Sequence, residues 1–501
     1  MEKLFDITSD YLYIPIQTGA EAAYLSLFEE ESGTKILEFK VPVGKVENGI
    51  YPCAFFARVP MHEWKRVKIL IKGNFPQEFF EAIKVADYVE SVKEQRPGIH
   101  FTAETGWIND PNGLVFDGEN YHLYFQYNPF DVAWENMSWG HAISKDLLHW
   151  QQLDTVLFPD EKGTMFSGCG LRNDRKMLGL PENALLFFYT SAGDASQWSK
   201  GMPFTQRFAY SVDGGRHLHK EETPYVDKIG KDSRDPKIFW HEETQAYIMI
   251  LYIEENDFAI LRSTNLEQWE ETQRFTLEKA WECPDLLNVP KEEGGSQWMF
   301  WCADGFYYWG DFDGYEFHTD GVRHKAYLSK IPYAAQTYSG VENRIISVAW
   351  LRFPNEGEIY TGAMGIPREL TCRETEHGYT LVQKEVAELK KLWKPVTAIS
   401  QDAVYKAVLT MKTDEPSISR LKINGSVVEY DPHTGILKME DEQVQIGSYV
   451  EEISLIVDKN ILEVGISGDI IIGVYKLNKS DNQFAYEIPE SAQIQLFEME
   501  K

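Results

Sequence analysis

The sequence predicts an all-β protein made of three consecutive domains. Its 501 residues correspond to about three domains at ~150 residues each. Apolar stretches are short and end at Gly, Pro or other turn residues, which is typical of strands, whereas long helical periodicity is scarce. We therefore expect a small N-terminal β-domain in residues 1–96, a five-bladed β-propeller in residues 97–393 and a C-terminal β-sandwich in residues 394–501.

The first domain is expected to contain short strands separated by glycine-bearing turns. Residues 35–43 and 66–71 are typical strand sequences, with glycines before and after them. Residues 79–94 suit either a helix or a last strand. The Arg-Pro-Gly turn at residues 96–98 closes the segment and sets the first boundary.

The middle segment is expected to be the propeller, because short aromatic strands alternate there with turn residues. The strands are expected at residues 121–127, 185–190, 246–253 and 298–303. A weak repeat also occurs: residues 144–150 match residues 263–269 at their Ser, Asp/Asn, Leu and Trp positions, and residues 211–215 resemble a third copy. The spacing suits blades of about four strands, so that ~290 residues hold about five blades. The alternative is chance similarity of strand–turn–strand sequences.

The last segment resumes with strands expected at residues 407–411, 426–430, 452–457 and 470–475. This run of short strands predicts the β-sandwich.

Charge and composition exclude several classes of partner. The chain has 78 Asp and Glu against 49 Lys and Arg, a net charge of −29. This charge repels phosphate backbones and anionic lipids, so neither nucleic acid nor a membrane surface is an expected partner. A neutral substrate is expected, and the aromatic content of 14% suits either stacking on sugar rings or buried strands.

The cysteine and histidine patterns point to a reducing compartment and to no metal. The chain starts without the basic and apolar regions of a signal peptide, and its five cysteines are scattered. We therefore expect a cytoplasmic protein. Because the 12 histidines show no ligand spacing, neither a metal nor another cofactor is expected.

Three acidic motifs in the middle segment each place a carboxylate beside a proline or a turn. They are Trp-Ile-Asn-Asp-Pro-Asn-Gly at residues 107–113, Ser-Arg-Asp-Pro-Lys at residues 233–237 and Trp-Glu-Cys-Pro-Asp at residues 281–285. Taken singly, the first is a turn signal and the second a structural salt bridge. The third flanks its glutamate with an aromatic ring and a thiol, surroundings that are expected to desolvate the carboxylate.

Together, in this order within an all-β segment, the three motifs resemble glycoside hydrolase family 32, the β-fructosidases that include invertases, levanases and inulinases. The resemblance covers about residues 97–501 and continues through residues 124–129, 139–142, 144–150, 166–168, 366–370 and 457–464. It implies a five-bladed propeller followed by a β-sandwich, which agrees with the organisation expected from the strand pattern.

The resemblance also implies a role for each carboxylate. Asp110 would be the nucleophile, Asp235 the transition-state stabiliser and Glu282 the general acid/base. The substrate-binding residues implied in the same way are Asn109, Gln126, Trp134, Ser167, Arg234 and Trp350. The alternative for the last set is structural, since the polar members would also suit strand edges and the tryptophans a propeller core.

Two features depart from the family pattern. Residues 328–336, Leu-Ser-Lys-Ile-Pro-Tyr-Ala-Ala-Gln, lack the Asp-x-Gly-x-Asp stretch that often precedes the Tyr-Ala pair, which leaves the leaving-group side of the pocket undefined. Residues 1–96 are an additional domain, whose expected role is a packing partner, a contact in a homo-oligomer or an accessory sugar site.

The expected function is that of a retaining β-fructofuranosidase, which hydrolyses terminal β-D-fructosyl residues from sucrose or short fructo-oligosaccharides. A fructosyltransferase would use the same three carboxylates. A carbohydrate-binding or sensing protein without catalysis is the alternative of another class, and the intact Asp110, Asp235 and Glu282 argue against it.

Overall fold

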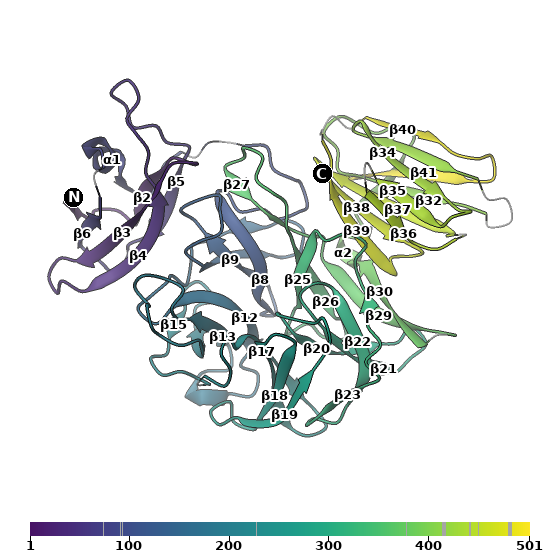
Figure 1. Ribbon diagram of the computed structural model, residues 1–501, viewed down its shortest axis with the longest axis horizontal. Coiled ribbons are helices and arrows are strands. Elements are labelled where there is room, and N and C mark those ends of the chain that lie inside the picture. The colour runs from purple at the N-terminus through teal and green to yellow at the C-terminus, as the bar shows by residue number, and fades with distance from the viewer. Residues whose placement is uncertain are drawn as a thin grey trace.

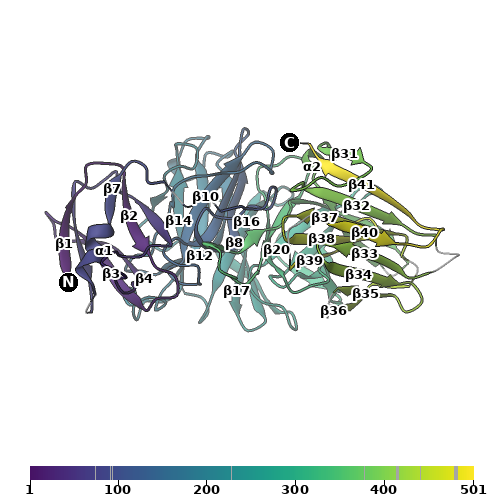
Figure 2. The same cartoon turned by 90° about the horizontal axis from the view of Figure 1, so that it is seen from above.

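The computed structural model describes residues 1–73, 75–90, 92, 94–226, 228–376, 378–412, 417–439, 442–448, 450–478 and 483–500. Strands dominate these residues, and the helices are the short α1 (Gln77–Ala82), α2 (Ala387–Lys390) and the 3₁₀ turn η1 (Met177–Gly179). Figures 1 and 2 show three β-structures in a row, with the propeller in the middle. The predicted all-β class is confirmed. No helix in the described part of the chain is long and apolar enough to cross a membrane.

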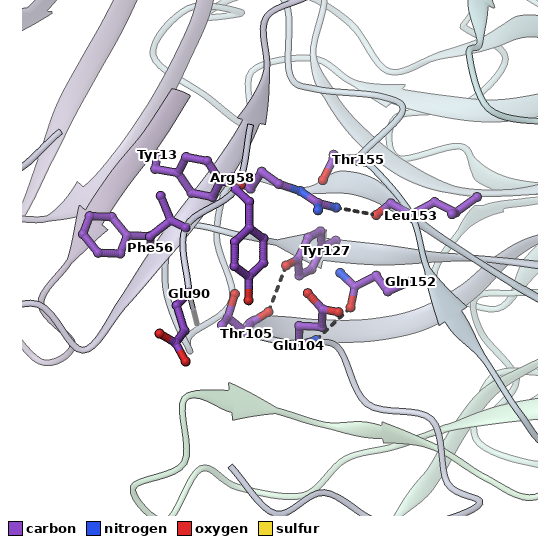
Figure 3. Close-up of a pocket in the computed structure, with 12 residues that line it drawn as sticks. Tyr13, Phe56, Arg58, Glu90, Glu104, Thr105, Tyr127, Gln152, Leu153 and Thr155 are labelled. Atoms are coloured by element: carbon purple, nitrogen blue, oxygen red, sulfur yellow. Dashed lines mark hydrogen bonds between the residues drawn. The ribbon is translucent and has the colours of Figure 1, made fainter. Parts of the chain in front are cut away.

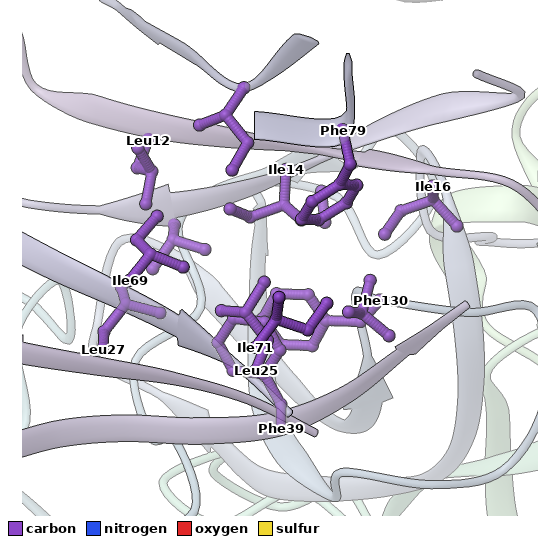
Figure 4. Close-up of a cluster of buried hydrophobic side chains, with 14 of the residues drawn as sticks. Leu12, Ile14, Ile16, Leu25, Leu27, Phe39, Ile69, Ile71, Phe79 and Phe130 are labelled. Atoms are coloured by element: carbon purple, nitrogen blue, oxygen red, sulfur yellow. The ribbon is translucent and has the colours of Figure 1, made fainter. Parts of the chain in front are cut away.

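The N-terminal domain is a small two-layer β-structure. One sheet has the order β1 (Glu2–Asp6), β6 (Arg66–Ile71), β3 (Ala22–Glu29) and β4 (Lys35–Pro42), and the other has β5 (Phe55–Pro60), β2 (Tyr11–Ile16) and β7 (Lys84–Ala86). The segment predicted as helix or strand holds both, because α1 is followed directly by β7. Alternate apolar side chains of β2, β3 and β6 meet between the sheets, with Phe79 of α1 closing one side (Figure 4).

In the described residues the propeller consists of five blades with four main strands each, and the sheet of the first blade has β27 (Tyr360–Thr361) as an additional edge strand. Their innermost strands are β8 (Gly106–Phe116), β12 (Thr164–Arg172), β16 (Arg234–His241), β20 (Asp285–Pro290) and β25 (Pro332–Thr337). The first three blades continue outward through β9 (Tyr121–Asn128), β10 (Ser138–Ser144) and β11 (Gln151–Gln152); β13 (Leu185–Ala192), β14 (Thr205–Ser211) and β15 (His219–Lys220); and β17 (Ala246–Glu254), β18 (Asp257–Ser263) and β19 (Glu270–Thr276).

The fourth and fifth blades follow the same plan. They continue through β21 (Ser296–Trp301), β22 (Phe306–Phe312) and β23 (Phe317–Thr319), and through β26 (Ile346–Leu351), β29 (Arg368–Thr375) and β30 (Gly378–Glu385), with β24 (His324–Lys325) paired to β22 and β28 (Ala363–Met364) to β26. The segment β27 (Tyr360–Thr361), which follows β26, pairs in parallel with β8 and so joins the last blade to the first.

The sequence repeat marks the same point in three blades. Each copy begins at the serine that ends a blade's third strand, namely Ser144 of β10, Ser211 of β14 and Ser263 of β18. In each copy the serine Oγ donates to the Asp or Asn side chain two residues later, over 3.0, 2.6 and 3.1 Å. The repeat is therefore a recurring turn chemistry and not chance similarity.

The C-terminal domain is a sandwich of two sheets. The six-stranded sheet has the order β31 (Trp393–Val396), β41 (Gln493–Met499), β32 (Tyr405–Thr410), β37 (Glu452–Asp458), β38 (Ile461–Ile466) and β39 (Ile471–Lys476). The five-stranded sheet has β36 (Glu442–Gln445), β35 (Ile436–Met439), β34 (Ser426–Asp431), β33 (Ser419–Ile423) and β40 (Phe484–Glu487).

A buried ionic network joins the sandwich to the propeller. The ring of His100 lies 2.9 Å from Asp458 Oδ2 and 3.1 Å from Glu463 Oε1, and Glu463 also accepts a hydrogen bond from Arg368. Asp458 accepts three further bonds from the main chain of residues 98–100. The network thus attaches the start of the propeller segment to the sandwich.

The N-terminal domain contacts the first blade beside a small pocket of about 90 Å³ (Figure 3). Arg58 of β5 pairs with Asp154 Oδ1 at 2.9 Å and donates to the carbonyl of Leu153 at 3.3 Å. Tyr11 donates to Asp154 Oδ2 at 3.1 Å. These contacts attach the domain to the loop that follows β11.

Candidate active site

One pocket of about 210 Å³ brings together all nine residues predicted for the site. Its wall consists of Asn109, Asp110, Gln126, Trp134, Ser167, Arg234, Asp235, Glu282 and Trp350, with Met137, Phe166 and Tyr333 in addition. The structure therefore places the three acidic motifs, which are spread over residues 107–285 of the chain, around one cavity.

The propeller architecture explains this convergence. Asp110, Ser167, Asp235 and Tyr333 lie in the first part of four different innermost strands, and Glu282 lies three residues before the start of the remaining one, β20. Because the innermost strands surround one axis, their starting ends meet at one end of the propeller. Each blade thus supplies at least one side chain to the pocket.

The strands that hold the site are irregular at the site residues themselves. The pairing register shifts between Ile108 and Pro111 in β8, between Met165 and Gly168 in β12, between Arg234 and Lys237 in β16, and between Tyr333 and Gln336 in β25. Proline has no N–H for the ladder, so Pro111 and Pro236 help to interrupt pairing there. Bulges of this kind change the direction in which side chains point, and these four lie at residues that line the pocket.

Three neighbouring backbone positions are also in the left-handed region. The φ angles are +61° at Asp235, +53° at Glu282 and +42° at Cys283. This conformation costs energy for non-glycine residues and is typically retained at functional sites. The strain therefore coincides with two of the three carboxylates.

Asp110 is held by three neighbours. Ser167 Oγ donates to its Oδ2 at 2.6 Å, Asn109 Nδ2 to its Oδ1 at 3.3 Å, and the Cys283 thiol to its Oδ2 at 3.5 Å. Burial raises the pKa of Asp110, the bond from Ser167 lowers it, and the nearby charge of Glu282 raises it again. A carboxylate at this place is oriented and poorly hydrated, as a nucleophile requires.

Asp235 is the most deeply buried of the three carboxylates. Its Oδ2 accepts a bond from the main-chain N–H of Cys283 at 3.1 Å, and Arg234 Nε lies 3.8 Å away. Burial raises the pKa of Asp235 to about 7, against the lowering effect of Arg234 and with the help of the negative charges of Glu282 and Asp110.

Glu282 faces the pocket between two donors. Arg234 Nη2 donates to its Oε1 at 2.7 Å, and Tyr333 Oη donates to its Oε2 at 2.6 Å. Of its two neighbours in the sequence, Trp281 is 50% exposed, whereas Cys283 is buried. The surroundings of Glu282 come from residues 48 and 51 positions away in the chain.

Cys283 lies between two of the carboxylates. Its sulfur is 3.5 Å from Asp110 and 3.6 Å from Asp235, and the side chain is buried. Burial and the neighbouring carboxylates raise the pKa of the thiol well above its usual range. The thiol is therefore protonated and suits a hydrogen-bond donor, not a nucleophile.

The predicted binding residues combine pocket and structural roles. Asn109 accepts a bond from Trp107 Nε1 at 3.0 Å while it donates to Asp110. Gln126 lines the pocket and donates to the carbonyl of Met165 at 2.8 Å. The two tryptophans are at the pocket wall and not in the propeller core, because Trp134 is half exposed and Trp350 is partly exposed.

Sequence reasoning missed Tyr333. This residue contacts Glu282 and its ring packs edge-on against Trp350 at 6.2 Å. It belongs to the Tyr-Ala pair at residues 333–334, next to the point where the chain departs from the family pattern. That pair was the signal that would have identified it. Met137 and Phe166 also line the pocket; Phe166 belongs to the stretch 166–168 that resembles the family, whereas Met137 lies outside the stretches that carry the resemblance.

No group of metal-ligating side chains large enough to hold an ion occurs in the described part of the chain. The site residues are carboxylates held by hydrogen bonds and one guanidinium, and this set fits acid–base and nucleophilic chemistry.

Comparison with known proteins places the fold and site in one family. Residues 100–385 match the model of the glycosyl hydrolases family 32 N-terminal domain. The chain is 34% identical over 344 residues to a levanase of Bacillus subtilis, over 61% of this chain and 50% of the levanase. It is also 34% identical over 389 residues to an extracellular exo-inulinase of Meyerozyma guilliermondii, over 70% of this chain and 73% of the inulinase.

Two solved structures are similar in fold. A fructofuranosidase of Schwanniomyces occidentalis aligns over 81% of this chain and 98% of its own, with a TM-score of 0.70 and 25% identity. A glycoside hydrolase family 32 protein of Bifidobacterium adolescentis aligns over 99% of this chain and 97% of its own, with a TM-score of 0.66 and 18% identity, so its fold includes the N-terminal domain.

The extent of the sequence match differs between relatives. The chain spans about half the length of the levanase and of an invertase from Debaryomyces hansenii, of which it covers 50% and 54%. The family model nevertheless covers more than half of the chain and includes all three acidic motifs. The chain therefore belongs to glycosyl hydrolase family 32.

Proposed function

We propose that this protein is a retaining β-fructofuranosidase that removes terminal β-D-fructosyl residues from sucrose or short fructo-oligosaccharides. The observation that carries the proposal is the convergence of Asp110, Asp235 and Glu282 in one pocket with separate hydrogen-bond partners. The relatives named levanase, invertase and exo-inulinase support the substrate class.

In the first half-reaction Asp110 attacks the anomeric carbon while Glu282 gives a proton to the leaving oxygen. Retaining glycosidases place two carboxyl groups ~5 Å apart for these roles. Ser167 and Asn109 hold the attacking carboxylate in one orientation. Water then attacks the anomeric carbon of the fructosyl-enzyme, Glu282 accepts a proton from the water, and the bond to the Asp110 carboxylate breaks, which releases fructose.

Asp235 has a supporting role. Its carboxylate, fixed by the Cys283 N–H, accepts hydrogen bonds from fructosyl hydroxyls that become more acidic as positive charge develops on the ring. Arg234 and Tyr333 orient Glu282 before the substrate enters.

The test is a pair of isosteric substitutions. Asp110→Asn and Glu282→Gln should each lower kcat on sucrose and 1-kestose by about three to five orders of magnitude, since groups that act as one catalytic unit fail together. Glu267→Gln, at an exposed position outside the pocket, is the matched control and should retain full turnover. Near-normal turnover of either pocket variant would contradict the role of that residue.

Product chromatography of the wild-type protein at high sucrose concentration separates hydrolysis from fructosyl transfer. Free fructose is expected in excess over trisaccharide. Dominant trisaccharide would make the chain a fructosyltransferase with the same three carboxylates.

We also propose a cytoplasmic location, although some relatives are named extracellular. The support is that all five cysteines are unpaired, four of them buried, as suits a reducing compartment. Cell fractionation with an activity assay tests this. The homo-oligomer stays a prediction, which light scattering on the purified protein tests.

A further inference from the structure

The loop that joins β9 to β10 belongs to two domains at once. It comprises residues 129–137 and supplies Trp134 and Met137 to the wall of the active-site pocket. The same loop inserts Phe130 into the hydrophobic core of the N-terminal domain, where the side chain is 0% exposed. Figure 4 shows Phe130 beside Phe39 and the apolar side chains of β2, β3 and β6.

Phe39 of β4 makes the closest contact with this inserted ring. The rings of Phe39 and Phe130 stack with centroids 3.6 Å apart and planes 7° apart. Val132 of the same loop also packs on this core. The apolar interior of the N-terminal domain is therefore completed by a propeller loop.

The main chain of the loop is attached to the same strand. β4 is the edge strand of its sheet, and an edge strand has unpaired N–H and C=O groups. The Asn136 side chain satisfies both groups of Lys40, since its Oδ1 accepts from the N–H at 2.8 Å and its Nδ2 donates to the C=O at 2.8 Å. Asn136 Nδ2 also lies 3.0 Å from Asn128 Oδ1, at the end of β9.

Trp134 lies between these two attachment points. Its side chain is 51% exposed, and its ring contacts Phe166 edge-on at 6.4 Å. Because half of this side chain is exposed, the position of the ring depends mainly on the position of the backbone that carries it. That backbone is anchored by Phe130 on one side and by Asn136 on the other.

We propose that the N-terminal domain is a positioning element of the substrate pocket, which acts through Phe39 and the Lys40 main chain on the loop that carries Trp134. The proposal rests on the proposed function and assigns the role that the sequence left open for residues 1–96. Because neither Phe39 nor Lys40 lines the pocket, the domain acts on substrate binding and leaves the carboxylates in place. Perturbing the contact should raise KM and leave kcat unchanged.

The first test compares two core substitutions of the same kind. Phe39→Leu weakens the contact with Phe130, whereas Phe79→Leu removes an equally buried ring from the same core, one whose ring contacts are with Tyr51 and Phe80. Phe39→Leu should raise KM for sucrose by about three- to tenfold, the equivalent of losing one aromatic contact. Phe79→Leu should leave KM unchanged.

A double-mutant cycle then tests the route through Trp134. Phe39→Leu should have no further effect on KM in a Trp134→Ala background, because the ring it positions is gone. Effects of Phe39→Leu and Trp134→Ala that multiply would overturn the proposal. So would an equal rise in KM for Phe39→Leu and Phe79→Leu, which would indicate general loosening of the domain.

A second pair of variants serves if Phe39→Leu fails to fold. Asn136→Gly removes both side-chain bonds to Lys40 while keeping the positive φ of +50° accessible. Lys40→Ala keeps the main-chain bonds and removes only side-chain contacts, namely the ion pair with Glu135 and the contact of the ammonium with the Tyr24 ring. Asn136→Gly should raise KM and Lys40→Ala should not, and the reverse order would overturn the proposal.

Hydrogen exchange separates this inference from the proposed function. Backbone amides of residues 130–137 should lose protection in Phe39→Leu and keep it in Phe79→Leu, whatever the protein hydrolyses. Unchanged protection in Phe39→Leu refutes the positioning role. Absence of fructosidase activity in the wild-type protein would instead refute the proposed function and leave the exchange result standing.

Discussion

Replacing His100 with Gln tests the buried network that joins the sandwich to the propeller. The ring of His100 is fully buried between Asp458 and Glu463. Burial lowers the pKa of His100, but the hydrogen bonds and charges of the two carboxylates outweigh it and raise the pKa from 6.5 to about 9. The charged ring is therefore the form that the folded protein stabilises.

The size of the effect follows from this shift. At 1.36 kcal/mol per pKa unit, a change from 6.5 to about 9 corresponds to about 3 kcal/mol of folding free energy. Since the folded pKa is the higher one, this stabilisation is complete below pH 6.5 and disappears as the pH rises through 9. Glu463 behaves in the opposite sense. Burial raises its pKa, but Arg368 and His100 outweigh burial and lower the pKa to about 2. The contribution of Glu463 to the folding free energy therefore disappears as the pH falls from 4.5 towards 2.

Urea unfolding between pH 5.5 and 9.5 measures the effect. The wild-type protein should lose about 3 kcal/mol of unfolding free energy between pH 6.5 and 9.5 relative to His100→Gln. The variant should be less stable at pH 6, because a buried charge pair loses one partner. His149→Gln, at an exposed position, is the control and should follow the wild-type curve. Parallel pH curves for wild type and His100→Gln would refute the reasoning.

Four further predictions concern the pocket and the N-terminal domain. Ser167→Ala removes a donor that lowers the pKa of Asp110, so the acid limb of the kcat/KM profile should move to higher pH; an unmoved limb in a pH–rate series would contradict the role of this bond. With Glu282→Gln, an activated aryl fructoside should lose much less of its fructosylation rate than sucrose does, as stopped-flow measurement can check, and equal losses would argue against proton donation by Glu282. Across a chain-length series, kcat/KM per fructosyl unit should be highest for two to about four sugars, because the pocket of about 210 Å³ is narrow; a steady rise towards levan or inulin would refute this. A chain beginning near Gln95 should be poorly soluble in a sedimentation assay, because it exposes Phe130.

The sequence by itself determined the all-β class, the positions of strands such as Tyr121–Asn128, and the choice of three carboxylates that line one pocket. Those features depend on nearby residues in the chain. Short runs of aromatic and apolar residues between turn residues specify strands such as Tyr121–Asn128. The prolines after Asp110 and Asp235 interrupt strand pairing and so favour the bulges at these two carboxylates. Each serine-based turn is also formed by residues only a few positions apart, so the blade repeat can be seen in the sequence alone.

Only the tertiary structure decided how these parts affect one another. Glu282 takes its partners from Arg234 and Tyr333, on two other blades, and not from Trp281 beside it. The role of the N-terminal domain depends on Phe130. This residue belongs to the propeller in the sequence, but its side chain packs in the core of the N-terminal domain. Burial, the interaction of charges and the sharing of a core depend on distances in space. The spacing of residues along the chain does not specify which side chains of different blades come into contact.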